Sequence, residues 1–138
     1  MVNRQERAEQ FMLEGGMDNA LAVFEAELAD SPDDASAWSN VGWALYDLGR
    51  HEEARAHLER ALEIDPGRDE AWVCIGMMQT NPIESIRYFD KALALAPNHG
   101  STWFLKSEAL REQGRCEEAD ECLTRAKSLD PKMFSSTS

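Results

Sequence analysis

Apolar residues recur at helical spacing along the chain, in stretches that are separated by glycines and prolines. In the clearest stretch Trp38, Val41 and Leu45 fall on one side of a helix when successive residues are placed about 100° apart. Glycine permits a positive φ and proline lacks an amide hydrogen, so each stretch is predicted to end at one of these residues. First helices are predicted to end at Gly15, Gly49 and Gly114, and second helices before Pro32, Pro66, Pro97 and Pro131. The pattern therefore predicts a series of helical hairpins.

These hairpins follow a regular period. The prolines Pro32, Pro66, Pro97 and Pro131 are 34, 31 and 34 positions apart, and Trp38, Trp72 and Trp103 are 34 and 31 positions apart. A period of this size is typical of one supersecondary unit stacked on copies of itself. The chain is thus predicted to be a tandem array.

The residues at fixed places in each unit carry a family resemblance. The second repeat has Trp38, Gly42, Gly49, Ala54, Leu58, Ala61 and Pro66. The third repeat has Trp72, Gly76, Ser85, Phe89, Ala92 and Pro97. The fourth repeat has Trp103, Ser107, Gly114, Ala119, Leu123, Ala126 and Pro131. This series resembles the tetratricopeptide repeat. A first copy has Ala8, Phe11, Gly15, Ala20, Phe24 and Pro32, but Arg4 stands in place of the tryptophan and Glu27 in place of the alanine. Both departures are typical of a terminal repeat that meets water.

The resemblance implies an all-α fold, a right-handed α-solenoid of four helical hairpins with about eight antiparallel helices. The repeats are expected at 1–34, 35–68, 69–99 and 100–133, in one domain over 1–133, followed by a short tail at 134–138. The third repeat is shorter and has Thr80-Asn81-Pro82 where a glycine turn is expected. Asn81 suits a helix cap and Pro82 a first helical turn, so a shortened first helix is predicted there.

Charge and composition exclude several classes of function. The 138 residues include 26 acidic and 14 basic ones, giving a net charge of −12, and there is no run of basic residues. Binding to phosphate needs clustered Lys or Arg, so nucleic acid is not an expected partner, whereas a basic or zwitterionic protein segment is. No segment approaches 18 apolar residues and residues 1–7 contain no apolar signal core, so we expect no membrane span and a cytoplasmic protein. An odd cysteine count, with Cys74, Cys116 and Cys122, also favours a reducing compartment.

The sequence does not indicate catalysis. His51 and His57 lie about 240° apart on one predicted helix and His99 is remote, so no zinc-ligand spacing is present. There is no glycine-rich phosphate loop and no nucleophile elbow. We therefore expect no enzyme activity, no cofactor and no metal, and an adaptor, scaffold or chaperone-like role in binding another protein.

The resemblance implies that the first helices line a concave groove for a peptide or an amphipathic helix. The predicted floor is apolar and its margins are acidic, which suits an apolar segment with basic flanks. The predicted groove residues are Met12, Trp43, Tyr46, Asp47, Glu70, Val73, Cys74, Met77, Phe104, Leu105 and Glu108. Trp43 is outside the packing positions, so its ring is either half-covered by neighbours or available to a ligand. Val73 and Leu105 could equally pack against second helices.

Two further predictions concern the partner. Members of the resembled family that bind chaperones clamp a C-terminal carboxylate with Lys, Asn and Arg, but the matching positions here hold Gln5, Glu9, Asn40, Glu70 and Cys74. Two acids would repel such a ligand, which argues against a carboxylate clamp. The alternative function is self-assembly as a homodimer through the last hairpin, because the tail is too short to cover it. The residues expected in that interface are Leu123, Leu129, Met133 and Phe134.

Overall fold

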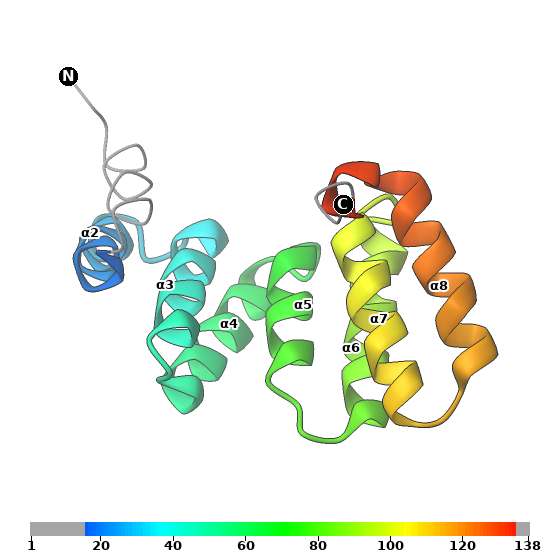
Figure 1. Ribbon diagram of the computed structural model, residues 1–138. Coiled ribbons are helices and arrows are strands. Elements are labelled where there is room, and N and C mark those ends of the chain that lie inside the picture. The colour runs from blue at the N-terminus through cyan, green and yellow to red at the C-terminus, as the bar shows by residue number, and fades with distance from the viewer. Residues whose placement is uncertain (1–15, 135–138) are drawn as a thin grey trace. The chain divides into compact units, whose positions relative to one another are not determined.

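The computed structural model describes residues 16–134, and all of the helices below belong to that range (Figure 1). This part of the chain contains seven α-helices and one short 3-10 helix and has no strand. The helices are α2 (Met17–Asp30), α3 (Ala35–Asp47), α4 (His51–Ile64), α5 (Asp69–Met77), α6 (Pro82–Leu95), α7 (Gly100–Glu112), α8 (Cys116–Leu129) and η1 (Pro131–Phe134). The predicted all-α fold is confirmed.

The predicted helix ends are confirmed wherever the structure describes them. The helices α2, α4, α6 and α8 each have 14 residues and end two residues before Pro32, Pro66, Pro97 and Pro131, respectively. After α3 and α7 the chain turns at Gly49 and Gly114, whose φ angles are 81° and 80°. Residues with a side chain rarely adopt that conformation, so glycine is required there. Gly15 lies outside the described residues.

The third hairpin differs from its neighbours as its sequence predicts. Its first helix, α5, has 9 residues, whereas α3 and α7 each have 13. The side chain of Asn81 accepts a hydrogen bond of 2.9 Å from the Ile83 amide, and Pro82 begins α6. The missing residues therefore come from the first helix, and an asparagine cap starts the second one.

The chain forms two compact units, which divide between Ala71 and Trp72. In the first unit, α3 lies against both α2 and α4. A Cβ atom added to Gly42 would lie 2.6 Å from Cγ of Leu58, so the close approach of α3 and α4 depends on this glycine. The buried apolar residues of this unit include Ala20, Leu21, Phe24, Ala37, Val41, Ala44, Leu45, Ala54, Leu58 and Ala61.

In the second unit α6, α7 and α8 lie side by side (Figure 1). The apolar core of this unit contains Val73 of α5 together with Ile86, Phe89, Ala92, Ala109, Leu110, Ala119 and Cys122. Across the α6–α7 contact, Nζ of Lys106 lies 2.6 Å from a carboxylate oxygen of Asp90. Between α7 and α8, Arg111 and Asp120 form an ion pair of 3.0 Å. Apolar packing thus joins the helices, and ion pairs lie at their edges.

Candidate functional site

Three tryptophans serve the repeat scaffold. Trp72 and Trp103 are half-buried and pack against the core of the second unit. The indole N–H of Trp103 donates a hydrogen bond of 2.8 Å to the carbonyl of Pro97, and the indole N–H of Trp38 donates one of 2.7 Å to the carbonyl of Pro32. Each of these bonds fixes a tryptophan to the proline that ends the preceding repeat. These three tryptophans therefore have a structural role.

In the second, third and fourth repeats, the second helix also places a cation over the tryptophan of the same repeat. The cation occupies the same position of the second helix in all three repeats, and an Arg or Lys over an indole face is attracted by the ring electrons. The pairs are Arg60 with Trp38 (5.9 Å to the ring centroid), Lys91 with Trp72 (4.5 Å) and Arg125 with Trp103 (5.4 Å). The charged groups cover aromatic surface that would otherwise face water.

Trp43, the fourth tryptophan, has different surroundings. Its half-buried ring meets Tyr46 edge to face, with ring centroids 6.1 Å apart and an interplanar angle of 84°. The Tyr46 ring in turn stacks on His51 at 5.0 Å and 18°. We call these three residues the aromatic row. Asp47, four residues after Trp43 on α3, is exposed. The first unit therefore presents partly exposed aromatic rings beside a carboxylate.

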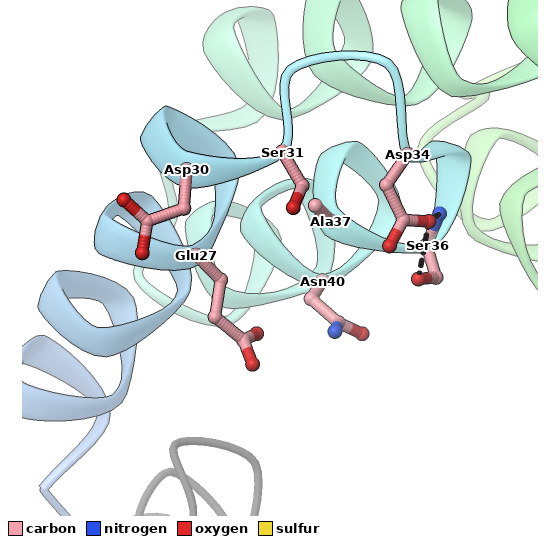
Figure 2. A pocket seen from close by; sticks show the side chains of 7 residues that line it. All are labelled: Glu27, Asp30, Ser31, Asp34, Ser36, Ala37 and Asn40. Atoms are coloured by element: carbon pink, nitrogen blue, oxygen red, sulfur yellow. Dashed lines mark hydrogen bonds between the residues drawn. The ribbon is translucent and has the colours of Figure 1, made fainter.

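A polar cavity of about 280 Å³ lies where α2 ends and α3 begins (Figure 2). We call it the α3 pocket. Its lining consists of three carboxylates, two hydroxyls, an amide and a methyl group, which belong to Glu27, Asp30, Asp34, Ser31, Ser36, Asn40 and Ala37. A lining of this composition favours a positively charged or hydrogen-bonding group.

Asp34 has a structural role at this pocket. Its carboxylate accepts hydrogen bonds from the amide of Ser36 at 2.9 Å and from its hydroxyl at 2.7 Å, so it caps the N-terminus of α3. The Ser36 hydroxyl and amide hold the pKa of Asp34 below its ordinary value. The carboxylate is therefore ionised at neutral pH and adds a fixed negative charge to the pocket.

The α3 pocket and the aromatic row lie on the same face of α3. Ser36, Asn40, Trp43 and Asp47 follow one another at spacings of four, three and four residues, which places them in one stripe along the helix. We call this stripe the α3 face. Two of its residues line the pocket, and the other two bring the indole and an exposed carboxylate. Two polar residues, an aromatic residue and an acidic residue thus follow one another along a single surface.

In the second unit, Phe104 occupies the surface of α7. It is half-buried, and the ring of Phe134 from η1 lies 5.8 Å from it at an angle of 65°. Nζ of Lys127 lies 5.6 Å from the centre of the Phe134 ring. One predicted groove residue and one predicted dimer residue are therefore in contact with each other.

The other predicted groove residues have mixed surroundings. Met77 and Leu105 are partly buried against the second core, and Glu108 is exposed beside a cavity of about 360 Å³ that Arg111 also lines. Glu70 is ion-paired with Arg68 at 2.6 Å. The exposed fraction is 8% for Val73 and zero for Cys74. Buried side chains cannot meet a partner without repacking, so the surfaces that we propose below leave these two out. Met12 lies outside the described residues.

The predicted dimer residues are only partly available. Leu123, Leu129 and Phe134 are half-buried, whereas Met133 is 37% exposed. Phe134 already contacts Phe104 within its own unit. The short η1 turn therefore shields part of the last hairpin, which the sequence had suggested would be left uncovered.

Sequence reasoning missed the acidic residues of the α3 pocket. Glu27 and Asp30 lie in the last turn of α2, whereas Asp34 caps the start of α3, and only folding brings them together. One signal was present, since Glu27 stands where the repeat pattern has alanine. That departure indicated a polar end repeat but not a cavity.

Other chemistry is limited in the described part of the chain. Cys74 and Cys122 are buried free thiols and Cys116 is an exposed one. Burial raises the pKa of the Cys122 thiol, which keeps it protonated at neutral pH. Among residues 16–134, no three His, Cys, Asp or Glu side chains gather in an arrangement that could hold a metal ion. In the same range, no helix has the length and apolar character needed to cross a lipid bilayer.

The fold and these surfaces define a helical-hairpin repeat protein with tryptophan-centred packing. Residues 14–69 and residues 100–133 each match a family described as tetratricopeptide repeat, and the two matches together cover well over half of the chain. The chain belongs to the tetratricopeptide repeat proteins.

Comparisons with individual proteins agree with this assignment. FlbA of Caulobacter vibrioides is 32% identical over 91 residues, which are 64% of this chain and 15% of FlbA. The bovine BBSome complex member BBS4 is 31% identical over 72 residues, which are 51% of this chain and 14% of BBS4. The chain thus spans far less than two thirds of either relative. A crystal structure of MamA superposes with a TM-score of 0.74 and 17% identity over 93% of this chain and 77% of that one, and so it shares the fold.

Proposed function

We propose that the chain is a non-catalytic protein-interaction module that binds an apolar segment with basic flanks, either a peptide or an amphipathic helix, on its first helices. The observation that carries this proposal is Trp43, a partly exposed indole that lies outside the packing positions of its helix. Tryptophans at such positions are enriched among residues that dominate binding energy. The tetratricopeptide repeat fold supports a protein partner, and one relative is named as a member of a complex.

The proposed binding residues are argued separately for the two units. In the first, Trp43, Tyr46 and Asp47 combine aromatic surface with an exposed carboxylate. In the second, Phe104, Leu105 and Met77 supply half-buried apolar surface and Glu108 an exposed carboxylate. Apolar groups beside acids suit a segment in which apolar side chains alternate with Lys or Arg.

Self-assembly through the last hairpin is the alternative, and the exposure of Met133 is what favours it. The contact of Phe134 with Phe104 weighs against it, because that aromatic surface is used within the chain. We also propose a cytoplasmic location, since all three cysteines are free thiols, as is usual in a reducing compartment.

The test is a comparative capture from a lysate of the source cell with the wild-type chain, Trp43→Ala and Phe104→Ala. Ile83→Ala is the matched control, because it removes an apolar side chain that is 54% exposed and lies outside the proposed surfaces. We expect a partner to be retained by the wild type and the control and lost with Trp43→Ala. A residue that dominates binding contributes about 2 kcal/mol, or roughly thirtyfold in affinity.

Circular dichroism and the unfolding midpoint establish that each variant is folded, and the affinity of a captured partner is then measured with purified proteins. If Trp43→Ala and Phe104→Ala retained every protein that the wild type retains, binding through the first helices would be refuted.

A further inference from the structure

The four tryptophans differ in whether the chain supplies a cation for their rings. Trp38, Trp72 and Trp103 each have an Arg or Lys of their own repeat within 6 Å of the ring centre. Within residues 16–134, Trp43 has an aromatic neighbour, Tyr46, and no cation of the chain lies over its ring. Among aromatic side chains, the indole of tryptophan attracts a cation over its face most strongly. Trp43 is therefore a cation-accepting ring that this part of the chain leaves without a cation.

The charged groups near Trp43 on this face are mostly acidic, and negative charge attracts a cation. Asp47 is exposed one helical turn beyond the indole, and Asn40, one turn before it, lines the α3 pocket. Three carboxylates surround that pocket. Arg50, at the start of α4, is ion-paired with Glu53 at 2.7 Å. The α3 face thus carries negative charge on both sides of an indole, in a chain whose net charge is −12.

We infer that the α3 face binds a basic segment of a partner protein, with one Lys or Arg side chain in the α3 pocket and a second one over the ring of Trp43. This inference rests on the proposed function and goes beyond it, because it assigns the partner two cations and gives each of them a place. The acids set the sign of the charge and steer the approach, while the indole gives the second cation a defined contact.

The geometry of α3 also sets the spacing of these two cations. From Ser36, which lines the pocket, to Trp43 is seven residues, or about 10 Å along a helix. An extended chain covers about 3.3 Å per residue, so this distance corresponds to about three residues of a bound peptide. Asn40, the other end of the pocket lining on α3, is three residues from Trp43, or about 4.5 Å along the helix. The partner segment therefore carries its two cations no more than about three residues apart.

The probe that tests this is a capped synthetic hexapeptide, Ala-Arg-Ala-Leu-Arg-Ala, in which the two arginines are three residues apart. Its matched control replaces both arginines by citrulline, which keeps the shape of the side chain and removes its charge. Both peptides are titrated into the 138-residue chain while the indole N–H signals of the four tryptophans are followed by ¹H–¹⁵N NMR. The variant Trp43→Phe assigns the signal of Trp43.

We expect the arginine peptide to shift the signals of Trp43 and of the Ser36 and Asn40 amides, and to bind about tenfold or more tightly than the citrulline peptide. The indole signals of Trp38 and Trp103, which are hydrogen-bonded to proline carbonyls, should stay in place. Glu27→Gln and Asp47→Asn should each weaken binding about threefold. The control Glu117→Gln removes an exposed acid of α8, far along the sequence, and should leave the affinity unchanged.

Three results would overturn the inference, and they are distinguishable from a failure of the proposed function. Equal binding of the arginine and citrulline peptides through Trp43 would leave a peptide-binding surface but no cation site. If Glu27→Gln, Asp47→Asn and Glu117→Gln lowered the affinity for the arginine peptide equally, the acids would act only through general charge attraction. No shift of Trp43 with either peptide, while Trp43→Ala still abolishes capture of a partner, would show that the surface recognises a different chemistry.

Discussion

The hairpins of α3 and α7 have the same scaffold but different surfaces. Both first helices have 13 residues, both turn at a glycine with φ near 80°, and both hold a tryptophan on a proline carbonyl. On the surface, α3 presents the aromatic row beside an acidic pocket, whereas α7 presents Phe104 in contact with Phe134.

This difference shows which residues are free to specify function. The residues common to the two hairpins fix the turn, the helix ends and the packing, so they repeat. The residues that differ lie on the first-helix surfaces and in the junctions between repeats. The C-terminal turn partly covers the α7 surface through the contact of Phe134 with Phe104, which reduces the aromatic surface that α7 offers to a partner.

The prediction with the largest expected effect on the free energy of unfolding tests whether the two hairpins have the same scaffold. We expect Trp38→Ala and Trp103→Ala each to lower the free energy of unfolding by about 3 kcal/mol, because each removes a large packed ring and its hydrogen bond. Urea denaturation followed by circular dichroism measures both values. Trp→Phe at the same positions keeps most of the ring and loses the N–H donor, and it should cost about 1 kcal/mol. A threefold difference between the two alanine variants would contradict an equivalent scaffold.

A smaller effect should separate the two surfaces. Phe134→Ala removes the aromatic contact with Phe104 and should lower the free energy of unfolding by about 1 kcal/mol. The molar mass from light scattering should stay the same and be independent of concentration, because we place Phe134 within its own chain. Met133→Ala, in the same turn, is the control and should have little effect on stability, because its side chain is more exposed. A dimer that Phe134→Ala dissociates would instead establish the alternative function.

The smallest effect concerns two matching ion pairs. Glu53 and Glu118 are the third residues of α4 and α8, and Arg50 and Arg115 each donate two hydrogen bonds to them. These bonds hold the pKa of both carboxyls below its ordinary value. A lowered folded-state pKa means that the stabilisation is complete above the ordinary carboxyl range and is lost as the pH falls through the folded-state pKa.

Both pairs are exposed, so the change in stability should be small and salt-sensitive. The measurement is the urea midpoint as a function of pH for the wild type and for Glu53→Gln combined with Glu118→Gln. The double variant should lose less stability between neutral and acidic pH than the wild type does. Identical pH profiles would show that these pairs contribute nothing.

Most of the fold could be predicted from the sequence because the relevant signals are local. The prolines end the second helices, Gly49 and Gly114 supply the positive φ of the turns, and Asn81 with Pro82 starts α6 after the short α5. Each of these effects depends on a few neighbouring residues. Because the same signals repeat along the chain, the class of fold could also be predicted from the sequence.

The candidate site could be predicted only in part. Trp43 was identifiable because it falls outside the packing positions of its helix, and Asp47 because it follows on the same face. Val73 and Cys74 share the helical phase of groove residues but are buried. Their burial depends on how helices from distant parts of the chain pack, and helical phase alone does not contain that information.

The sequence by itself determined the hairpins, their period, the acidic charge and the one tryptophan outside the packing positions, because these follow from backbone preferences and spacing. Only the tertiary structure decided which charges and rings meet. It placed a cation over each scaffold tryptophan, joined Phe134 to Phe104, and gathered Glu27, Asp30 and Asp34 at a pocket on the α3 face. The physical reason is that side chains from separate helices interact only after packing has fixed the distances between those helices.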